Sequence, residues 1–258
     1  QEFWLSELQF GKSVFRITDH HSGFRENPKD SCFFFKKRVA EQVDLVSYTA
    51  RSLKEYASSL GAKEMVFSPN GVDIDHFSKG SRLMPDEFHP IPGPIAIYVG
   101  SMRYWFDYEL LNCAAEALPD LSFVLIGPED PSMKRLKQNS NVYYLGERSY
   151  SALPPYLHSA DVGILPFNVQ DFPELINFVN PIKMYEYFAC GLPVVSTSWD
   201  ELRVINGPAL LADSADEFIS CLELALSKEW DRDALTGFAE KHAWSNQVDQ
   251  LLDLLELS

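Results

Sequence analysis

The sequence has few cysteines, few basic residues and no long apolar run, and each shortage excludes a class of protein. The 4 cysteines, Cys32, Cys113, Cys190 and Cys221, are scattered and lack paired metal-ligand spacing. We interpret them as reduced core residues of a cytoplasmic protein. A membrane span would need about 18 consecutive apolar residues, and neither such a stretch nor a secretory signal pattern is present. The 6 histidines contain no HExxH motif, so they predict no metal site.

The charge balance is acidic and uneven along the chain. Lys and Arg number 22 against 37 Asp and Glu, which gives a net charge of −15. Residues 1–75 hold 10 basic and 11 acidic residues, so nearly all of the excess lies in the rest of the chain. Nucleic-acid binding needs a basic surface, which argues against DNA or RNA as the main partner. A phosphate site in the acidic part would need local positive groups of its own.

The most informative stretch is Asn180 to Ser196, which reads NPIKMYEYFACGLPVVS. Apolar residues between Ile182 and Ala189 follow the three- and four-residue spacing of a buried helix. Pro181 suits a first helical turn, and Gly191 suits the residue after a helix. The β-branched run that ends at Val195 predicts a buried parallel strand. The unit is therefore a loop, a helix, a glycine stop and a strand.

Two charged residues on this helix carry the chemistry. Lys183 lies in the first turn, where unpaired backbone amides and the helix dipole favour an anion. Glu186 follows three residues later on the same face. A cation with free amides suits phosphates, and a carboxylate one turn deeper suits sugar hydroxyls, so the spacing fits a nucleotide-sugar. A core helix with a weak surface ion pair is about as good an interpretation of the spacing alone.

The pattern Asn-Pro-x-Lys-x-Tyr-Glu-Tyr-x-Ala-x-Gly-x-Pro-Val-Val resembles the donor-binding segment of GT-B glycosyltransferases, in the glycosyl transferases group 1 superfamily. In that superfamily the glutamate at this place meets the ribose hydroxyls. The resemblance therefore implies a donor site at Asn180, Ile182, Lys183 and Glu186. The chain as a whole looks like the C-terminal part of such an enzyme, and its first residue, Gln1, favours a start inside a longer protein.

A second candidate group lies near the start of the chain. Residues 14–18 alternate like a strand and run into Asp19, His20 and His21, at the kind of strand end where open α/β sheets bind ligands. Position alone favours a loop or cap aspartate over a general base. However, Arg-Ile-Thr-Asp-x-x-x-Gly-Phe resembles a segment of the xanthan-assembly glucuronosyltransferase and its relatives. There the aspartate is the proposed base of an inverting reaction, which implies a catalytic role for Asp19.

Composition divides the chain into four parts. Residues 1–77 contain only about three predicted strands and end in an Asn-Gly-Val-Asp turn, like the C-terminal part of an N-terminal acceptor domain. Residues 78–94 have four prolines and little periodicity, which is typical of a linker. Residues 95–240 repeat strand and helix, as a donor-binding domain would. Residues 241–258 predict a last helix that crosses back to the first domain.

The donor domain offers further candidates along its strand ends. A buried strand over residues 95–99 runs into Gly100, Ser101 and Met102, where a glycine turn brings backbone close to a ligand. The commoner superfamily version has a basic residue soon after this glycine and a later Lys-Gly, and this chain lacks the Lys-Gly. Val-Gly-Ser-Met is instead similar to the glucuronosyltransferase group, in which the methionine packs near the donor. A core methionine is the alternative.

Four further residues are weaker donor-binding candidates. Gly146, Glu147 and Arg148 follow a predicted strand, in a loop that by resemblance runs near the nucleotide base. Phe167 ends another buried strand. It is followed by an irregular loop over residues 168–179 that leads into the central helix and is suited to cover the sugar.

One departure from the superfamily pattern bears on stereochemistry. Many retaining members carry a second glutamate eight positions before the one matched by Glu186, and this chain has Phe178 there. The broken pattern favours inversion, with Asp19 as base and Lys183 stabilising the departing diphosphate. No Asp-x-Asp metal motif lies near the donor segment, and the Asp-x-Asp that starts at Asp73 belongs to a turn, so no metal is expected.

These observations predict an α/β protein of the GT-B type, with a Rossmann-like donor domain and the tail of a second Rossmann-like domain. The predicted function is transfer of a sugar from a nucleotide-sugar, by resemblance a UDP-sugar, to a glycan or lipid-linked acceptor in bacterial polysaccharide synthesis. No cofactor is expected, and contact with a membrane surface would come through the N-terminal domain. A retaining transferase, a nucleotide-sugar epimerase and a non-catalytic nucleotide-sugar-binding module are the alternatives.

Overall fold

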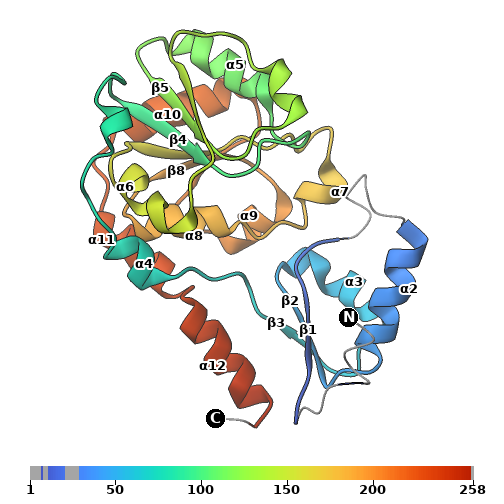
Figure 1. Cartoon of the computed structure of the whole chain (residues 1–258). Coiled ribbons are helices and arrows are strands. Elements are labelled where there is room, and N and C mark those ends of the chain that lie inside the picture. Colours follow the sequence, from blue (N-terminus) through green and yellow to red (C-terminus); the bar gives the residue numbers. More distant parts are fainter. Residues whose placement is uncertain (1–6, 8–10, 21–28, 257–258) are drawn as a thin grey trace.

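The computed structural model describes residue 7, residues 11–20 and residues 29–256 (Figure 1). All strands pair in parallel and form two separate sheets, one of three strands and one of six. Parallel strands need long connections, and these are mostly helical here, so the predicted α/β class is confirmed. His21, Gly23 and Phe24 of the predicted Asp19 motif lie outside the described residues.

The smaller sheet belongs to the first part of the chain. Its order is β1-β2-β3, with β1 at Val14–Ile17, β2 at Leu45–Tyr48 and β3 at Met65–Phe67. Its helices are α2 (Lys29–Ala40), the 3-10 turn η2 (Arg51–Leu53) and α3 (Lys54–Ser59). Buried residues of these elements, including Val46, Leu53 and Leu60, form a core of their own.

The larger sheet has the order β6-β5-β4-β7-β8-β9. Its strands are β4 (Ile95–Val99), β5 (Ser122–Ile126), β6 (Val142–Gly146), β7 (Val162–Leu165), β8 (Val194–Thr197) and β9 (Leu210–Ala212). The first strand, β4, lies in the middle beside β7, so the strand order reverses there. Ligands of open α/β sheets bind at the carboxyl ends of strands at such a reversal.

Helices cover both faces of the larger sheet. Figure 1 shows α5 (Tyr108–Ala117) and α10 (Ala215–Ser227) on one side, and α6 (Leu153–His158), α8 (Ile182–Ala189) and α9 (Asp200–Ile205) on the other. The remaining helices are α4 (Ile74–Ser78), α7 (Pro173–Ile176), α11 (Arg232–Glu240) and α12 (Trp244–Leu254), with short 3-10 turns η3 (Asp86–Phe88), η4 (Pro131–Arg135) and η5 (Tyr150–Ala152). Across the described residues, none of the helices combines the length and the apolar character needed to cross a bilayer.

The segment over residues 78–94, which the composition suggests is a linker, is packed against the larger sheet's unit. Phe88 is 2% exposed and Ile91 is 7% exposed, and both belong to the larger core. Val72 and Phe77 before it belong to that core as well. The packed part of the larger unit therefore begins about twenty residues before β4. Burial of these apolar side chains is favourable, and an exposed linker would forgo that stabilisation.

The chain crosses between the two units twice, and the two crossings touch. The Val72 amide donates to the His242 carbonyl at 2.9 Å, and the Trp244 amide donates to the Val72 carbonyl at 3.1 Å. A Cβ on Gly71 would lie 2.9 Å from the His242 carbonyl oxygen, so glycine allows this close approach. The Arg16 guanidinium of β1 lies 5.4 Å from the centre of the Trp244 ring, so α12 begins against the smaller sheet.

Candidate functional site

The first turn of α8 lies against the carboxyl end of β4. Gly100, just after β4, has a φ of +144°, and a Cβ there would lie 2.1 Å from Lys183 Cε. The Lys183 ammonium nitrogen lies 6.0 Å from the centre of the Tyr98 ring. Only glycine permits this contact, because the backbone conformation and the lysine stem both exclude a side chain. Gly100 and Lys183, predicted separately from the sequence, therefore meet at the strand-order reversal.

Glu186, one turn further along α8, is 9% exposed. Burial raises the pKa of its carboxyl, while Lys183 and His76 oppose that shift. Burial also lowers the pKa of the Lys183 ammonium, and Glu186 opposes it. Within the part of the chain that the structure describes, neither side chain has a hydrogen-bond or ion-pair partner. Two opposite charges are thus held in a poorly solvated place with unused hydrogen-bonding capacity, which is costly unless a ligand uses it.

Three glycines lie at the ends of neighbouring strands beside this pair, and we call the backbone surface that they form the glycine floor: Gly100, Gly127 and Gly146. The Gly100 amide donates to the Ile126 carbonyl at 2.7 Å, and the Gly127 amide donates to the Gly146 carbonyl at 3.0 Å. A Cβ on Gly127 would lie 2.0 Å from the Gly100 carbonyl oxygen. The ends of β4, β5 and β6 therefore pack backbone against backbone, and Ser101 lies on this floor with its carbonyl bonded to the Tyr98 hydroxyl at 2.9 Å.

Met102 belongs to the core and not to an exposed surface. Its residue exposure is 0%, and its carbonyl accepts a hydrogen bond from the Tyr108 hydroxyl. Its Cε lies 3.4 Å from the position of a Cβ on Gly127, so its side chain supports the glycine floor from within. The core methionine, the alternative to a donor contact, is the interpretation that this burial supports.

Asn180 holds the two units together. It is 3% exposed, its side-chain oxygen accepts from the Asn70 amide at 3.1 Å, and its carbonyl accepts from the Asn70 side chain at 2.7 Å. The side-chain nitrogen of Asn180, Nδ2, lies 3.5 Å from Glu201 Oε1. Because its side chain bonds protein groups on both sides, it is not directed at a ligand in this structure. Asn180 therefore joins residues around β3 to α8 and α9, and its role in donor binding stays a prediction.

The loop after β6 is tied to the segment that precedes β4. The Arg148 guanidinium donates to Glu87 and, at 3.1 Å, to the Tyr156 hydroxyl. The Tyr156 hydroxyl in turn donates to the other Glu87 oxygen at 2.5 Å. Glu147 is exposed, and Gly146 has a φ of +76° at the end of β6. Arg148 is therefore engaged in an ion pair rather than directed at a nucleotide base.

Asp19 lies just beyond β1, beside the loop that leads into α8. Its carboxylate accepts from the Thr18 hydroxyl at 2.9 Å, and its carbonyl accepts from Lys36 at 3.3 Å. The neighbouring His20 ring stacks on Phe178, with centroids 4.8 Å apart. The first sheet's strand end and the residue two positions before Asn180 are therefore in contact, which places Asp19 close to the loop that leads into α8.

Two residues near Glu186 were not predicted from the sequence. The His76 ring stacks on Tyr150 with centroids 4.6 Å apart, and Glu186 helps to raise the pKa of Tyr150 to about 12, after the larger effect of burial. Tyr150 is 50% exposed, so its ring presents an aromatic surface beside the carboxylate. His76 and Tyr150 are more than 70 positions apart, so no spacing rule joins them.

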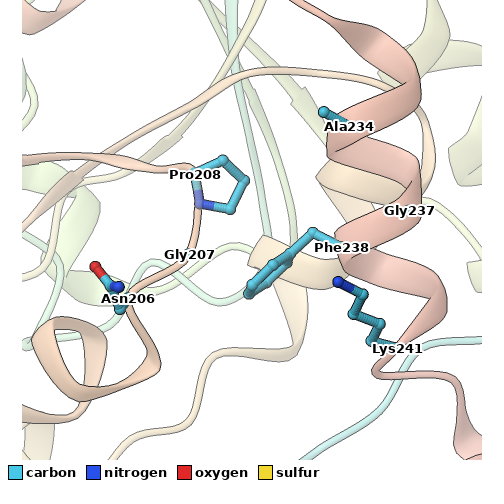
Figure 2. Close-up of a pocket in the computed structure, with 7 residues that line it drawn as sticks. All are labelled: Asn206, Gly207, Pro208, Ala234, Gly237, Phe238 and Lys241. Atoms are coloured by element: carbon cyan, nitrogen blue, oxygen red, sulfur yellow. The ribbon is translucent and has the colours of Figure 1, made fainter.

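The hollows of the surface lie mostly away from this pair. A hollow of about 500 Å³ lies between the loop after α9 and α11, lined by Asn206, Pro208, Phe238 and Lys241 (Figure 2). Another, of about 640 Å³, lies at the carboxyl ends of β7 to β9 and includes Phe167. Among the described residues no three His, Cys, Asp or Glu side chains are grouped to hold a metal ion.

Comparison with known proteins gives a consistent result. The family model described as Glycosyl transferases group 1 matches residues 93–228, more than half of the chain. A curated relative, the putative teichuronic acid biosynthesis glycosyltransferase TuaH of Bacillus subtilis, is 27% identical over 231 residues. That match covers 83% of this chain and 57% of TuaH, so the chain spans a little over half of the relative's length.

Solved structures share the fold at low sequence identity. Sucrose-phosphate synthase from Thermosynechococcus elongatus is 16% identical with a TM-score of 0.70, over 98% of this chain and 69% of the other. Anabaena Alr3699/HepE, solved in complex with UDP and glucose, is 13% identical with a TM-score of 0.71, over 94% of this chain and 71% of the other. The two parallel sheets and their helices thus match the GT-B architecture.

Proposed function

The chain belongs to the glycosyl transferases group 1 family, and on that premise we propose that it binds a UDP-sugar and transfers the sugar to a glycan or lipid-linked acceptor. The setting is synthesis of a bacterial surface polysaccharide. Because the chain spans 57% of its curated relative, the complete transfer reaction is proposed for the whole protein. The donor half of the reaction is proposed for the residues of the larger sheet.

One observation carries this proposal: the unpartnered charges of Lys183 and Glu186 beside the glycine floor. A lysine at the start of α8, together with the helix's free amides, provides positive potential for a diphosphate. A carboxylate one turn deeper accepts hydrogen bonds from ribose hydroxyls, and its burial makes those bonds stronger than they would be in water. Gly100 lets the Lys183 stem lie directly against the backbone at the end of β4, next to the place proposed for the diphosphate.

We propose an inverting displacement of the xanthan-assembly glucuronosyltransferase type. The acceptor hydroxyl loses its proton to the Asp19 carboxylate and attacks the anomeric carbon, while the bond from that carbon to the diphosphate breaks. Lys183 and the α8 amides stabilise the negative charge of the departing UDP. The stack of His20 on Phe178 supports this arrangement, because it places an aromatic ring where a retaining enzyme would carry a glutamate.

Calorimetric titration of the chain with UDP tests the donor site. Lys183→Ala and Glu186→Ala each remove one charge-assisted contact, so we expect each to weaken binding about tenfold or more. Lys137→Ala and Glu116→Ala are matched controls, since those side chains form an exposed ion pair on the surface. Equal affinity in wild type and both α8 variants would contradict the proposal.

Turnover separates the transferase from its alternatives. In the whole protein, release of UDP that depends on an acceptor identifies transfer, whereas conversion of the UDP-sugar without acceptor identifies an epimerase. UDP binding with neither reaction identifies a binding module. Asp19→Asn should reduce acceptor-dependent release by a factor of 100 or so if Asp19 is the base, and near-full activity of this variant would exclude that role. The anomeric configuration of the product distinguishes inversion from retention.

A further inference from the structure

A second charged hollow lies at the other end of α8. It measures about 250 Å³ and forms where the segment after α4, the end of α6, the end of α8 and the start of α11 meet. Lys183 occupies the first turn of α8, while Cys190 and Gly191 at the opposite end line this hollow. The hollow is therefore separate from the proposed donor site, although the same helix reaches both.

Two arginines without partners line this hollow. Arg82 comes from the segment after α4, and Arg232 is the first residue of α11. Within the described residues neither guanidinium has an ion pair or a side-chain hydrogen bond. By contrast, Arg103, Arg135 and Arg203 each lie within 4.0 Å of a carboxylate. Two cations of an acidic chain thus line one hollow without a carboxylate partner.

The charge of both guanidiniums reaches into the hollow. Burial lowers the pKa of His158, and Arg82 and Arg232 lower it further, while the carbonyls of Phe77 and Cys190 oppose them. Arg82 also opposes the rise that burial imposes on the pKa of the Cys190 thiol. Asp233 is the one acid in the described lining, so the hollow keeps a positive balance.

The stem of Arg232 packs against Gly191. A Cβ on Gly191 would lie 3.3 Å from Arg232 Cβ and 3.6 Å from Arg232 Cδ, so the arginine lies across the glycine at the end of α8. The segment that bears Arg82 is anchored as well, because a Cβ on Gly80 would lie 2.4 Å from Pro154 Cβ. Both arginine side chains are exposed, so an anion from solvent can reach two guanidiniums whose backbones belong to separately packed elements.

We propose that this hollow binds a phosphoryl oxyanion, such as inorganic phosphate, pyrophosphate or a phosphate monoester, between Arg82 and Arg232. Guanidinium groups match the oxygens of a tetrahedral phosphoryl group in paired hydrogen bonds. Since Arg82 lies in the segment that joins the two sheets, the bound anion would tie that segment to α11. This site goes beyond the proposed donor chemistry and does not depend on it.

Titration of the chain with inorganic phosphate at constant ionic strength tests the site. Arg82→Gln and Arg232→Gln should each weaken phosphate binding about tenfold, and the double variant should abolish it at millimolar concentration. Arg203→Gln is the matched control, because it removes the same charge from a guanidinium that is paired with Asp213. Lys183→Ala should bind phosphate like wild type, which separates this site from the donor site.

Two further measurements sharpen the outcome. The ring resonances of His158 should shift on addition of phosphate in wild type and stay unchanged in the double variant. Pyrophosphate and a sugar phosphate, titrated in the same way, distinguish a free anion from a phosphate ester as the preferred ligand. Absence of phosphate and pyrophosphate binding at 20 mM or so, or equal binding by the wild type and the double arginine variant, would overturn the proposal, as would loss of binding in Lys183→Ala alone.

Discussion

Two buried glutamates on neighbouring helices have opposite surroundings. Glu186 on α8 and Glu201 on α9 are 9% and 1% exposed, and burial raises the pKa of both. Glu201 accepts from the Arg51 amide at 2.7 Å and lies 3.5 Å from both the Ser52 amide and the Asn180 side chain. Glu186 has no such partner among the described residues.

The difference distinguishes a carboxylate whose hydrogen bonds are supplied by the fold from one that has none, as the proposed donor site requires. Glu201 lies over the start of η2 and so ties the smaller sheet's unit to the larger one. Its desolvation is offset by bonds that the fold itself supplies. The desolvation of Glu186 is not offset in this way, which is typical of a functional position. Burial alone therefore does not identify a site, and hydrogen-bond partners decide between the two roles.

Loss of Glu201 should produce the largest effect on stability. Glu201→Ala leaves the partly buried Arg51 amide without its acceptor and creates a cavity in place of the buried carboxylate, which should lower the free energy of unfolding by ~2–3 kcal/mol. UDP affinity should stay within about twofold, since Glu201 does not belong to the donor pair. Urea unfolding and calorimetry measure the two quantities. A tenfold loss of UDP affinity with an unchanged free energy of unfolding would give Glu201 the binding role and not the structural one.

Loss of Glu186 should act on binding and not on stability. Glu186→Ala should weaken UDP binding about tenfold, or ~1.4 kcal/mol, while the free energy of unfolding stays the same or rises. Glu201→Gln is the matched control, because it replaces a buried carboxylate on the next helix while keeping an oxygen acceptor. If Glu186→Ala unfolds as readily as Glu201→Ala, then Glu186 has a structural role.

The pH dependence of stability gives a finer contrast. Burial raises the pKa of Glu186 above 4.5, its ordinary value, so the stability due to this group is fully present below pH 4.5 and is lost as the pH rises through the folded-state pKa. Glu186→Gln keeps the uncharged form at every pH. It should therefore melt about 2–4 °C above wild type at pH 7–8 and like wild type below pH 4.5 or so, which is a difference of ~1 kcal/mol. Thermal melts of both proteins across this pH range test the sign of the difference in melting temperature.

The smallest expected effect is spectroscopic. Tyr150 has its pKa raised to about 12 by burial, by Glu186 and by Asp73. Glu186→Gln removes one of the two negative charges, so Tyr150 should ionise at a lower pH in that variant. Ultraviolet titration with and without Tyr150→Phe isolates this one tyrosine. An unchanged pKa would mean that the charge of Glu186 has no effect on Tyr150.

Much of the fold could be predicted because strands and glycine stops are local signals. The runs that end in Gly100 and Gly146 predicted β4 and β6, and both strands pair in parallel with β5. The strand β4 is buried and apolar on both faces, which is typical of a parallel sheet. Helices α5, α9 and α11 were not predicted, although Asp107 and Asp231 cap two of them. Short helices with mixed polarity give little periodic signal.

The site could be predicted only where one segment carries it. Lys183 and Glu186 lie one turn apart on one helix, so their shared face follows from helical geometry. The contact of Lys183 with Gly100, and of Asn180 with Asn70, depends on how distant segments pack. A polar residue within a binding motif looks the same in sequence whether it faces a ligand or another part of the protein.

The bridge between Val72 and Trp244 limits how the two units can move. The outgoing and returning crossings of the chain are hydrogen-bonded to each other, so they form a single joint and not two independent tethers. A joint of this kind permits rotation about one line but resists sliding, because sliding would break both amide bonds at once. Rotation of one unit against the other would therefore have its axis near Gly71, where the absence of a side chain lets the two crossings approach each other.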